Sequence, residues 1–110
     1  MTSSLDSSNN LLINEGVRLF GVLRVPGKAT INGFFEGELY ADQVEVGPRG
    51  HLSGVTTAND IEVSGRVYKT INCSNLCSIR IGGTLSGVLS YRELRVEKGG
   101  VFEGTLQKSS

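Results

Sequence analysis

The sequence predicts an all-β fold, a β-solenoid in which short parallel strands stack coil upon coil. The first observation behind this prediction is a repeated phrase of an apolar residue, any residue, and an apolar residue. Five copies align: Leu23-Arg24-Val25, Val44-Glu45-Val46, Ile61-Glu62-Val63, Ile79-Arg80-Ile81 and Leu94-Arg95-Val96. From the second copy on, the copies start 17, 18 and 15 residues apart. A period of this size, built from two-residue alternation, is typical of stacked coils.

The second observation is a glycine that recurs at one position of the coil, at Gly37, Gly54, Gly87 and Gly104. A corner that needs positive φ or a close backbone approach would select glycine there. Lys69 interrupts the series. The segment 73–78 adds three residues to the usual corner, so we expect a bulged loop there.

Each coil divides into three short strands, so the predicted solenoid is three-sided, with about six coils. The clearest coil has strands at 44–46, 52–54 and 56–58. Alternation turns the apolar partners inward, which predicts one core ladder through Val46, Val63, Ile81 and Val96. Residues 90–98 could pass for a helix, since Tyr91 and Leu94 are three apart, but the register with the other copies favours a strand.

The chain therefore holds one domain, predicted at 11–106. Residues 1–10 (MTSSLDSSNN) are small and polar, and predict a disordered tail. Residues 107–110 (QKSS) predict a second one. No apolar run approaches the roughly 20 residues that span a bilayer.

The charge is balanced overall but not along the chain. Eleven Lys and Arg face eleven Asp and Glu, so nothing favours a nucleic-acid partner. Residues 1–62 carry four basic and eight acidic side chains, and residues 63–110 carry seven and three. In a solenoid, sequence order is spatial order, so the two ends should differ in charge.

No constellation in the sequence predicts an enzyme, a metal site or a cofactor. Cys73 and Cys77 lack the partners of a zinc site or a disulfide framework and read as reduced thiols. His51, the single histidine, reads as a solvated turn residue, and Glu36 and Glu38 as surface charges. The stretch GVLRVPGK at 21–28 resembles a phosphate-binding loop, but five residues separate its glycines and Ala29 follows the lysine.

Hexapeptide acyltransferases are the enzymatic β-solenoids to test. Their strands start every six residues, whereas here the starts at 44, 52, 56 and 61 lie 8, 4 and 5 apart. The spacing therefore excludes that class.

An isolated solenoid needs caps, because its first and last coils expose unpaired backbone and an apolar cross-section. Neither predicted tail can supply one. We therefore expect other copies of the chain to cover the ends, through Val17 and Leu19 in the first coil and Phe102 and Leu106 in the last.

The run from Leu12 to Leu106, with its opening GVRLFGVLRVPGKATINGFFEGELYADQVEVG and its close RELRVEKGGVFEGTL, resembles a bactofilin domain. The resemblance implies a right-handed, three-sided parallel β-helix that polymerises without nucleotide into nonpolar filaments or sheets. It also implies a bacterial scaffold for cell-shape, cell-wall or polar proteins, at work in the cytoplasm or at the inner face of the membrane through partners.

Direct membrane binding is not favoured, because no Lys or Arg precedes Arg18. The alternative to a polymer is a soluble solenoid adaptor that binds a partner protein on its outer faces without extended polymerisation.

Overall fold

The computed structural model describes residues 4–5 and 10–108 of the 110. These residues form nine strands, and no helix occurs among them. The strands are β1 (Ser4–Leu5), β2 (Leu11–Ile13), β3 (Arg18–Ile31), β4 (Phe34–Val46), β5 (His51–Val63), β6 (Arg66–Ile79), β7 (Thr84–Tyr91), β8 (Glu93–Val96) and β9 (Val101–Lys108).

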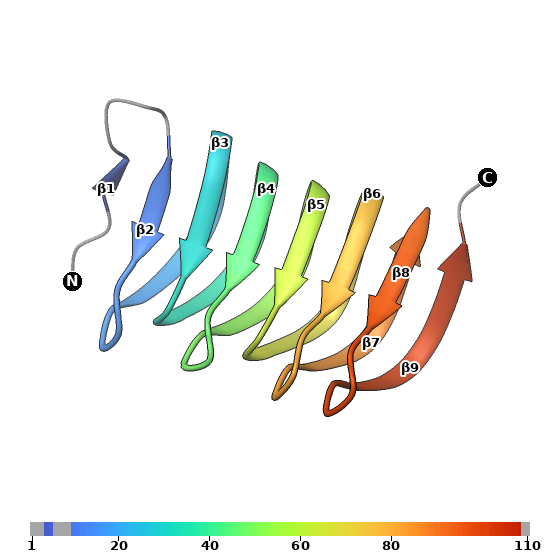
Figure 1. Ribbon diagram of the computed structural model, residues 1–110. Helices are drawn as coiled ribbons and strands as arrows, with labels where there is room; N and C mark the ends of the chain where they lie inside the picture. The colour runs from blue at the N-terminus through green and yellow to red at the C-terminus, as the bar shows by residue number, and fades with distance from the viewer. Residues whose placement is uncertain (1–3, 6–9, 109–110) are drawn as a thin grey trace.

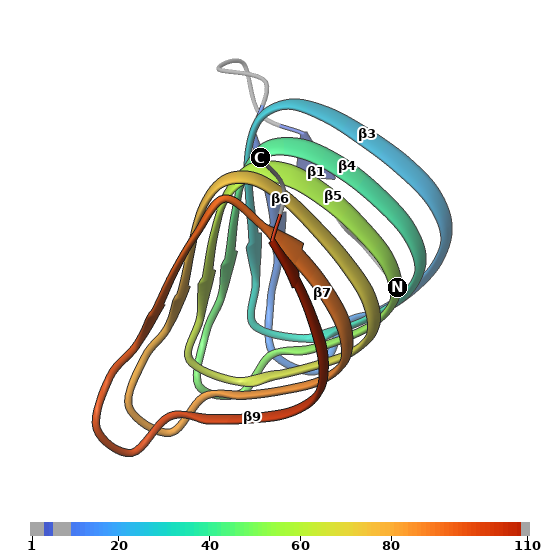
Figure 2. The same cartoon turned by 90° about the vertical axis from the view of Figure 1, so that its right-hand side faces the viewer.

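The strands form a parallel β-solenoid of about six turns, as the sequence predicts (Figure 1). Each long strand bends around the coil and pairs with the next strand in parallel, from β2 through β7 to β9, while β8 pairs with β6. Viewed along the axis from the C-terminal end, the coils lie over one another around three corners (Figure 2). Among the described strands only β1 runs the other way, in an antiparallel pair with β2.

The core is a stack of inward side chains, one rung per coil. Phe35, Leu52, Val67 and Leu85 form one column, each at most 1% exposed. Leu39, Thr56, Ile71 and Leu89 form another, in which Thr56 is the only buried polar residue of the described chain. Every buried side-chain nitrogen and oxygen of the described residues has a hydrogen-bond partner. Burial of these apolar columns is therefore the main stabilising term.

The register corrects one member of the predicted core ladder. Val46 and Val63 are fully buried and pair, but the partner of Val63 in the next coil is Ile79, and Val96 follows Ile79. Ile81 is 72% exposed, in the turn after β6. The prediction was wrong because two overlapping segments, Cys77-x-Ile79 and Ile79-x-Ile81, fit the repeat. Cys77 was not treated as an apolar inward residue, so the second segment was chosen, two residues out of register.

The structure also changes three smaller expectations from the sequence. Leu23 and Val25 pair with Leu39 and Ala41, so they belong to a different face from Val44, whose partner is Ala29. The bulge after Cys73 adds one residue relative to the strand before it, not three. His51 is the first residue of β5 and is partly buried, rather than a solvated turn residue.

The predicted tails fall mostly outside the described residues, at 1–3, 6–9 and 109–110. In the part of the predicted N-terminal tail that the structure describes, Ser4–Leu5 forms β1. At the other end, β9 continues to Lys108, two residues past the predicted end of the domain.

Two columns of glycine run along the corners. The column found in the sequence has positive φ throughout, and Lys69 shares it with a φ of 82°. The other column, Gly33, Gly50, Gly65, Gly83 and Gly100, was not recognised in the sequence. Backbone hydrogen bonds define this column, because the amide of the residue after each glycine donates to the carbonyl of the glycine one coil earlier. The amide of His51, for example, donates to the carbonyl of Gly33 at 2.9 Å.

Candidate assembly interface

The C-terminal end of the solenoid is an open apolar cross-section. Leu94 on β8 and Phe102 on β9 pack against the core with one side and are partly exposed on the other. Val96 and Leu106, their inward neighbours, are 49% and 45% exposed. Each would be covered by one further coil, since their equivalents one coil earlier, Ile79 and Leu89, are completely buried.

Backbone groups are open at this end as well. Among the described residues, β8 pairs only with β6 and β9 pairs only with β7. The outer edges of both strands therefore present unpaired N–H and C=O groups, which are a template for another strand. Apolar area and an open edge coincide here.

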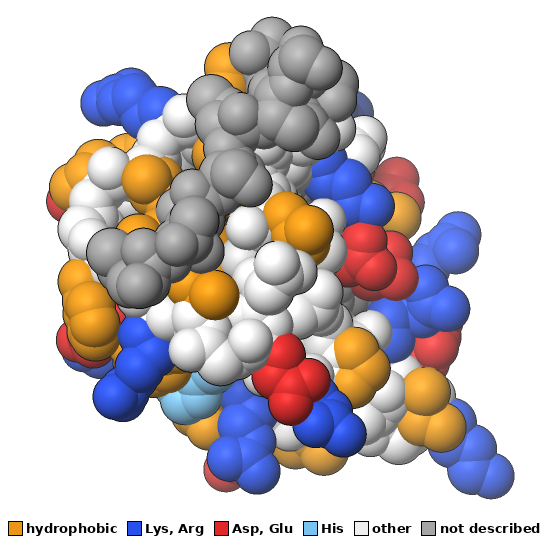
Figure 3. All heavy atoms as spheres, turned by 90° about the vertical axis from the view of Figure 1, so that its left-hand side faces the viewer, with side chains coloured by type: hydrophobic (Ala, Val, Ile, Leu, Met, Phe, Trp, Pro, Cys, Tyr) orange, Lys and Arg blue, Asp and Glu red, His pale blue; other side chains and the backbone are white. Residues whose placement is uncertain are grey.

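The N-terminal end is built differently. Val17, Leu19 and Leu23 in the first coil pack against the core and are partly exposed. On the neighbouring face, the antiparallel β1 occupies the outer edge of β2, whose Leu11 and Ile13 are at most 5% exposed. Figure 3 shows this end: hydrophobic side chains (orange) lie among Lys and Arg (blue) and Asp and Glu (red). The first half of β3 is the part of this end whose edge is open among the described strands.

Val17 marks the first rung of the second glycine column. The amide of Phe34 donates to the carbonyl of Val17 at 2.8 Å, so Val17 stands one coil before Gly33. A Cβ atom at Gly33 would overlap the carbonyl oxygens of Asn14 and Val17 in the coil before it. Among the described residues no coil lies before Val17, so its Cβ meets no carbonyl of this kind there. A chain stacked ahead in the same direction would meet that atom.

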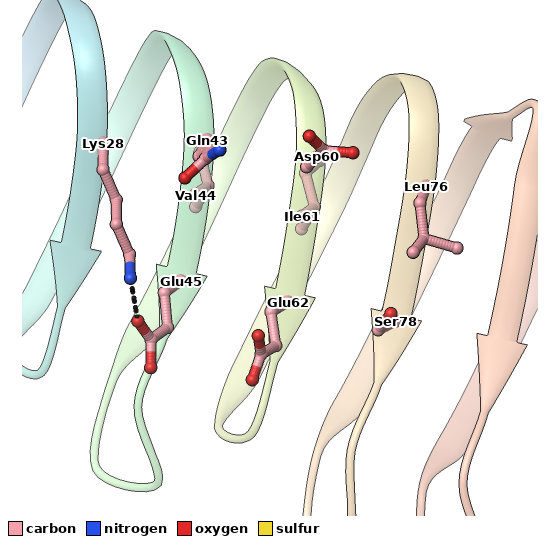
Figure 4. Close-up of a pocket in the computed structure, with 9 residues that line it drawn as sticks. All are labelled: Lys28, Gln43, Val44, Glu45, Asp60, Ile61, Glu62, Leu76 and Ser78. Carbon is pink, nitrogen blue, oxygen red and sulfur yellow. Dashed lines mark ion pairs between the residues drawn. The ribbon is translucent and has the colours of Figure 1, made fainter.

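The other residues that the sequence analysis considered for a site lie on the outer faces or in the core, without the partners that a catalytic or metal site needs. Figure 4 shows a shallow depression on the outer face, where Lys28 points at Glu45 and their ion pair spans 2.7 Å. This contact raises the pKa of Lys28. Asp60 and Glu62 lie on the next coil, yet no group of three His, Cys, Asp or Glu in the described residues could hold a metal ion.

The two cysteines are buried free thiols. Cys73 donates to the carbonyl of Asn59 at 3.2 Å, and both thiols are at most 3% exposed. The hydrogen bond with Cys73, and secondly burial, raises the pKa of the Cys77 thiol, so it stays protonated. They occupy core positions in the stack.

His51 and the carboxylates Glu36 and Glu38 do not form a unit. The ring of His51 stacks on Phe34, with 4.8 Å between centroids. Glu38 instead accepts a hydrogen bond from the hydroxyl of Tyr40 at 2.7 Å. No helix in the described part of the chain has the length and apolar character of a membrane span.

The model of one protein family, described as "Bactofilin: Polymer-forming cytoskeletal", matches residues 11–107. The chain belongs to the bactofilin family. Comparison with curated proteins and comparison with solved structures gave no match.

This family is a structural one, whose members are polymer-forming and cytoskeletal. The matched segment contains both open ends, from β2 to the second-last residue of β9. Val17, Leu19, Phe102 and Leu106, which the sequence analysis expects at the contact, lie in the first and last described coils, and their role in a contact stays a prediction. Sequence reasoning missed Val96 as an exposed member of the C-terminal surface, and the register of β6 with β8 was the signal that could have found it.

Proposed function

We propose that this bactofilin self-assembles end to end, without nucleotide, into nonpolar filaments in which like ends meet. The observation that carries the proposal is the uncovered apolar coil of β8 and β9, with Val96 and Leu106 about half exposed. Covering such a surface with an identical one across a two-fold axis removes apolar area from water and pairs open strand edges.

Like-to-like contact is supported at the opposite end by sterics. A head-to-tail copy would continue the coil ahead of Val17 and force its Cβ onto carbonyl oxygens, where the chain otherwise uses glycine. It would also need the edge of β2 that β1 already occupies. A two-fold contact through the open first half of β3 leaves β1 in place, and the backbone that faces Val17 then runs in the opposite direction.

Nucleotide independence follows from the surroundings of the glycines in 21–28. This segment lies inside β3, which pairs with β4 on both sides of a register shift between Val25 and Lys28, and no helix of the described chain follows it. The helix N-terminus that holds phosphate in a nucleotide-binding loop is therefore lacking behind these glycines in the described chain. The filament would then act as a cytoplasmic scaffold that reaches the membrane or the cell wall through bound proteins.

Electron microscopy of the purified chain tests the proposal. Filaments should form with or without ATP, GTP and Mg²⁺. Phe102→Arg and Leu106→Arg each place like charges across the contact, so each variant should form only folded dimers joined through the N-terminal ends. The control is Arg66→Glu, which changes an exposed side chain in the middle of the solenoid and should leave filaments intact.

Circular dichroism of each variant separates loss of assembly from loss of folding. Discrete small particles from the unchanged chain would favour an adaptor over a polymer. Long filaments from both arginine variants would show that the C-terminal coil is not the contact.

A further inference from the structure

The two cysteines are nucleophilic core residues that the assembly interface does not use. Cys73 and Cys77 both belong to β6 and stand on either side of one corner of the coil. Cys73 pairs with Ala58 of the coil before it, and Cys77 pairs with Ile61. Both cysteine side chains are part of the buried core, at most 3% exposed. The corner therefore brings two thiols to one place inside the solenoid.

The two thiols contact each other across this corner. Cys73 donates to the carbonyl of Asn59 at 3.2 Å, which leaves its sulfur free to accept a hydrogen bond from Cys77. Both are free thiols. A disulfide needs the sulfur atoms to close to about 2.05 Å. Sulfur atoms that are already in hydrogen-bond contact need only a short further approach, so the reduced pair is preorganised for a disulfide.

The backbone at this corner is longer than in the coil before it. Three residues separate the two cysteines, whereas β5 crosses the same corner with two residues between Ala58 and Ile61. The extra residue makes the bulge Ser74-Asn75, whose side chains are exposed and hydrogen-bond to β5. A bulge locally disrupts the strand ladder. The corner can therefore shift as the sulfur atoms approach, and Cys73 lies one residue from an exposed segment.

The two sulfur atoms differ in reactivity. The hydrogen bond with Cys77 lowers the pKa of Cys73, against the opposing effect of burial. The same hydrogen bond, and secondly burial, raises the pKa of Cys77. The thiolate is the nucleophile in cysteine chemistry. Cys73, beside the exposed bulge, is therefore the sulfur that attacks an oxidant, and Cys77 is the sulfur that resolves the product.

We infer that Cys73 and Cys77 form a reversible modification site, which takes hydrogen peroxide and stores the oxidation as a disulfide within the chain. In the first step the Cys73 thiolate attacks one peroxide oxygen. The S–O bond forms and the O–O bond breaks, and the departing hydroxide takes up the proton that Cys73 released, which gives water and a sulfenic acid.

In the second step the sulfur of Cys77 attacks the sulfenic sulfur of Cys73. The S–S bond forms and the S–O bond breaks, and the hydroxyl group leaves as water with the thiol proton of Cys77. The pair has then given two electrons to the peroxide. A dithiol reductant returns them by thiol–disulfide exchange.

The site lies in an interior coil of the solenoid. β6 pairs with β5 on one side and with β7 and β8 on the other. A disulfide there joins the two sides of one corner and leaves both ends of the solenoid as they are. Oxidation at this site is therefore independent of end-to-end assembly, and its failure would leave the proposed function untouched.

Peroxide treatment of the folded, unchanged chain tests the site. After remaining thiols are alkylated, trypsin cuts behind Lys69 and Arg80, so one peptide, 70–80, carries both cysteines. We expect this peptide to lose the mass of two hydrogen atoms and to regain it when the protein is treated with dithiothreitol. Circular dichroism should stay native throughout, and a non-reducing gel should show no linked dimer.

The matched control is the same chain unfolded in urea, in which both thiols are open to peroxide. If the folded chain keeps both thiols at peroxide doses that fully oxidise the unfolded chain, the inference is overturned. A product linked only between chains, or sulfinic and sulfonic acids in place of the disulfide, would overturn it as well.

Single substitutions test the order of the two steps. Cys77→Ser removes the resolving sulfur at nearly constant size, so the folded variant should hold a sulfenic acid on Cys73 that dimedone traps. Cys73→Ser leaves only the thiol whose pKa is raised, and should lose this labelling. Stronger labelling of Cys73→Ser than of Cys77→Ser would overturn the assigned roles. If circular dichroism shows that a variant does not fold, the peptide mass from the unchanged chain still decides whether the site exists.

Discussion

The corrected ladder shows how little separates a core residue from a surface residue in this fold. Ile79 and Ile81 are two residues apart and follow the same sequence pattern, yet one is fully buried and the other is 72% exposed. The difference arises because β6 ends at Ile79 and the chain then leaves the coil for a four-residue turn.

We predict opposite outcomes for an aspartate at these two positions. Ile79→Asp buries an unpaired charge in the stack and should cost several kcal/mol, a large part of the roughly 5–15 kcal/mol that stabilises a typical domain. Ile81→Asp should leave the urea midpoint nearly unchanged. Equal destabilisation of the two variants would show that the register of β6 is wrong.

Lys69 is the strained residue of the glycine column. It is the only non-glycine residue with positive φ in the described chain, at 82°, where Gly54 and Gly87 on either side have 116° and 124°. The left-handed region costs an L-residue about 1–2 kcal/mol, and Lys69 is exposed, so it gains no burial in return.

Lys69→Gly should therefore stabilise the solenoid, by about 1 kcal/mol after the entropic cost of glycine. The matched control is Gly54→Ala, whose Cβ would overlap the carbonyl of Gly37 and should destabilise the fold. Thermal melting of both variants measures the effect. A destabilised Lys69→Gly chain would mean that the lysine side chain contributes more than the backbone loses.

At the scale of elements, a row of aromatic side chains ties four strands together on one outer face. Phe20 on β3, Phe34 on β4, His51 on β5 and Tyr68 on β6 follow one another, with ring centroids 5.8, 4.8 and 4.9 Å apart. Cross-strand ring pairs of this kind contribute about 0.5–1.5 kcal/mol each. The row adds cohesion from outside the core.

His51 makes this row sensitive to pH. Partial burial, and secondly Arg66, lowers the pKa of His51, while Glu36 opposes the change. The unfolded chain takes up the proton near pH 6.5, where the folded chain still resists it. Stability is thus complete above that pH and falls as the pH drops below it.

His51→Phe keeps the row and removes the titration. We expect the urea midpoint of the unchanged chain to fall more between pH 7.5 and pH 5.5 than that of the variant. Carboxylates contribute equally to both chains and cancel in the comparison. An identical fall in the two chains would contradict the assignment.

The same elements show what the sequence could and could not predict. The solenoid, its strands and its open ends follow from alternation and from glycine at one corner, because both reflect local backbone geometry. The phase of β6 was misjudged because Cys77 serves as an inward apolar residue. The second glycine column at Gly33 and Gly50 was missed, since its cause is the carbonyl of the preceding coil, a contact between residues far apart in sequence.

At the scale of the whole molecule, two effects compete over how copies meet. The acidic first half and basic second half would attract one another head to tail. Charges about 8 Å apart in water interact by only about 0.5 kcal/mol, and physiological salt screens them over about the same distance. A Cβ at the equivalent Gly33 would overlap carbonyl oxygens of the coil before it, and the same overlap, inferred for Val17 against a preceding coil, cannot be screened. Sterics therefore outweigh charge, and like ends should meet.

This reasoning predicts the axial repeat of the filament. About six coils at about 4.8 Å each give roughly 29 Å per copy. When like ends meet, neighbouring copies point in opposite directions, so the structure repeats only after two copies, at roughly 58 Å. A head-to-tail filament would repeat at roughly 29 Å.

Averaged electron micrographs of single filaments distinguish the two values. We expect a repeat of roughly 58 Å with two-fold axes perpendicular to the filament. A repeat of one copy length, with no perpendicular two-fold axis, would mean that the coil continues past Val17 in one direction and that the clash at this residue is relieved by a rearrangement of the first turn.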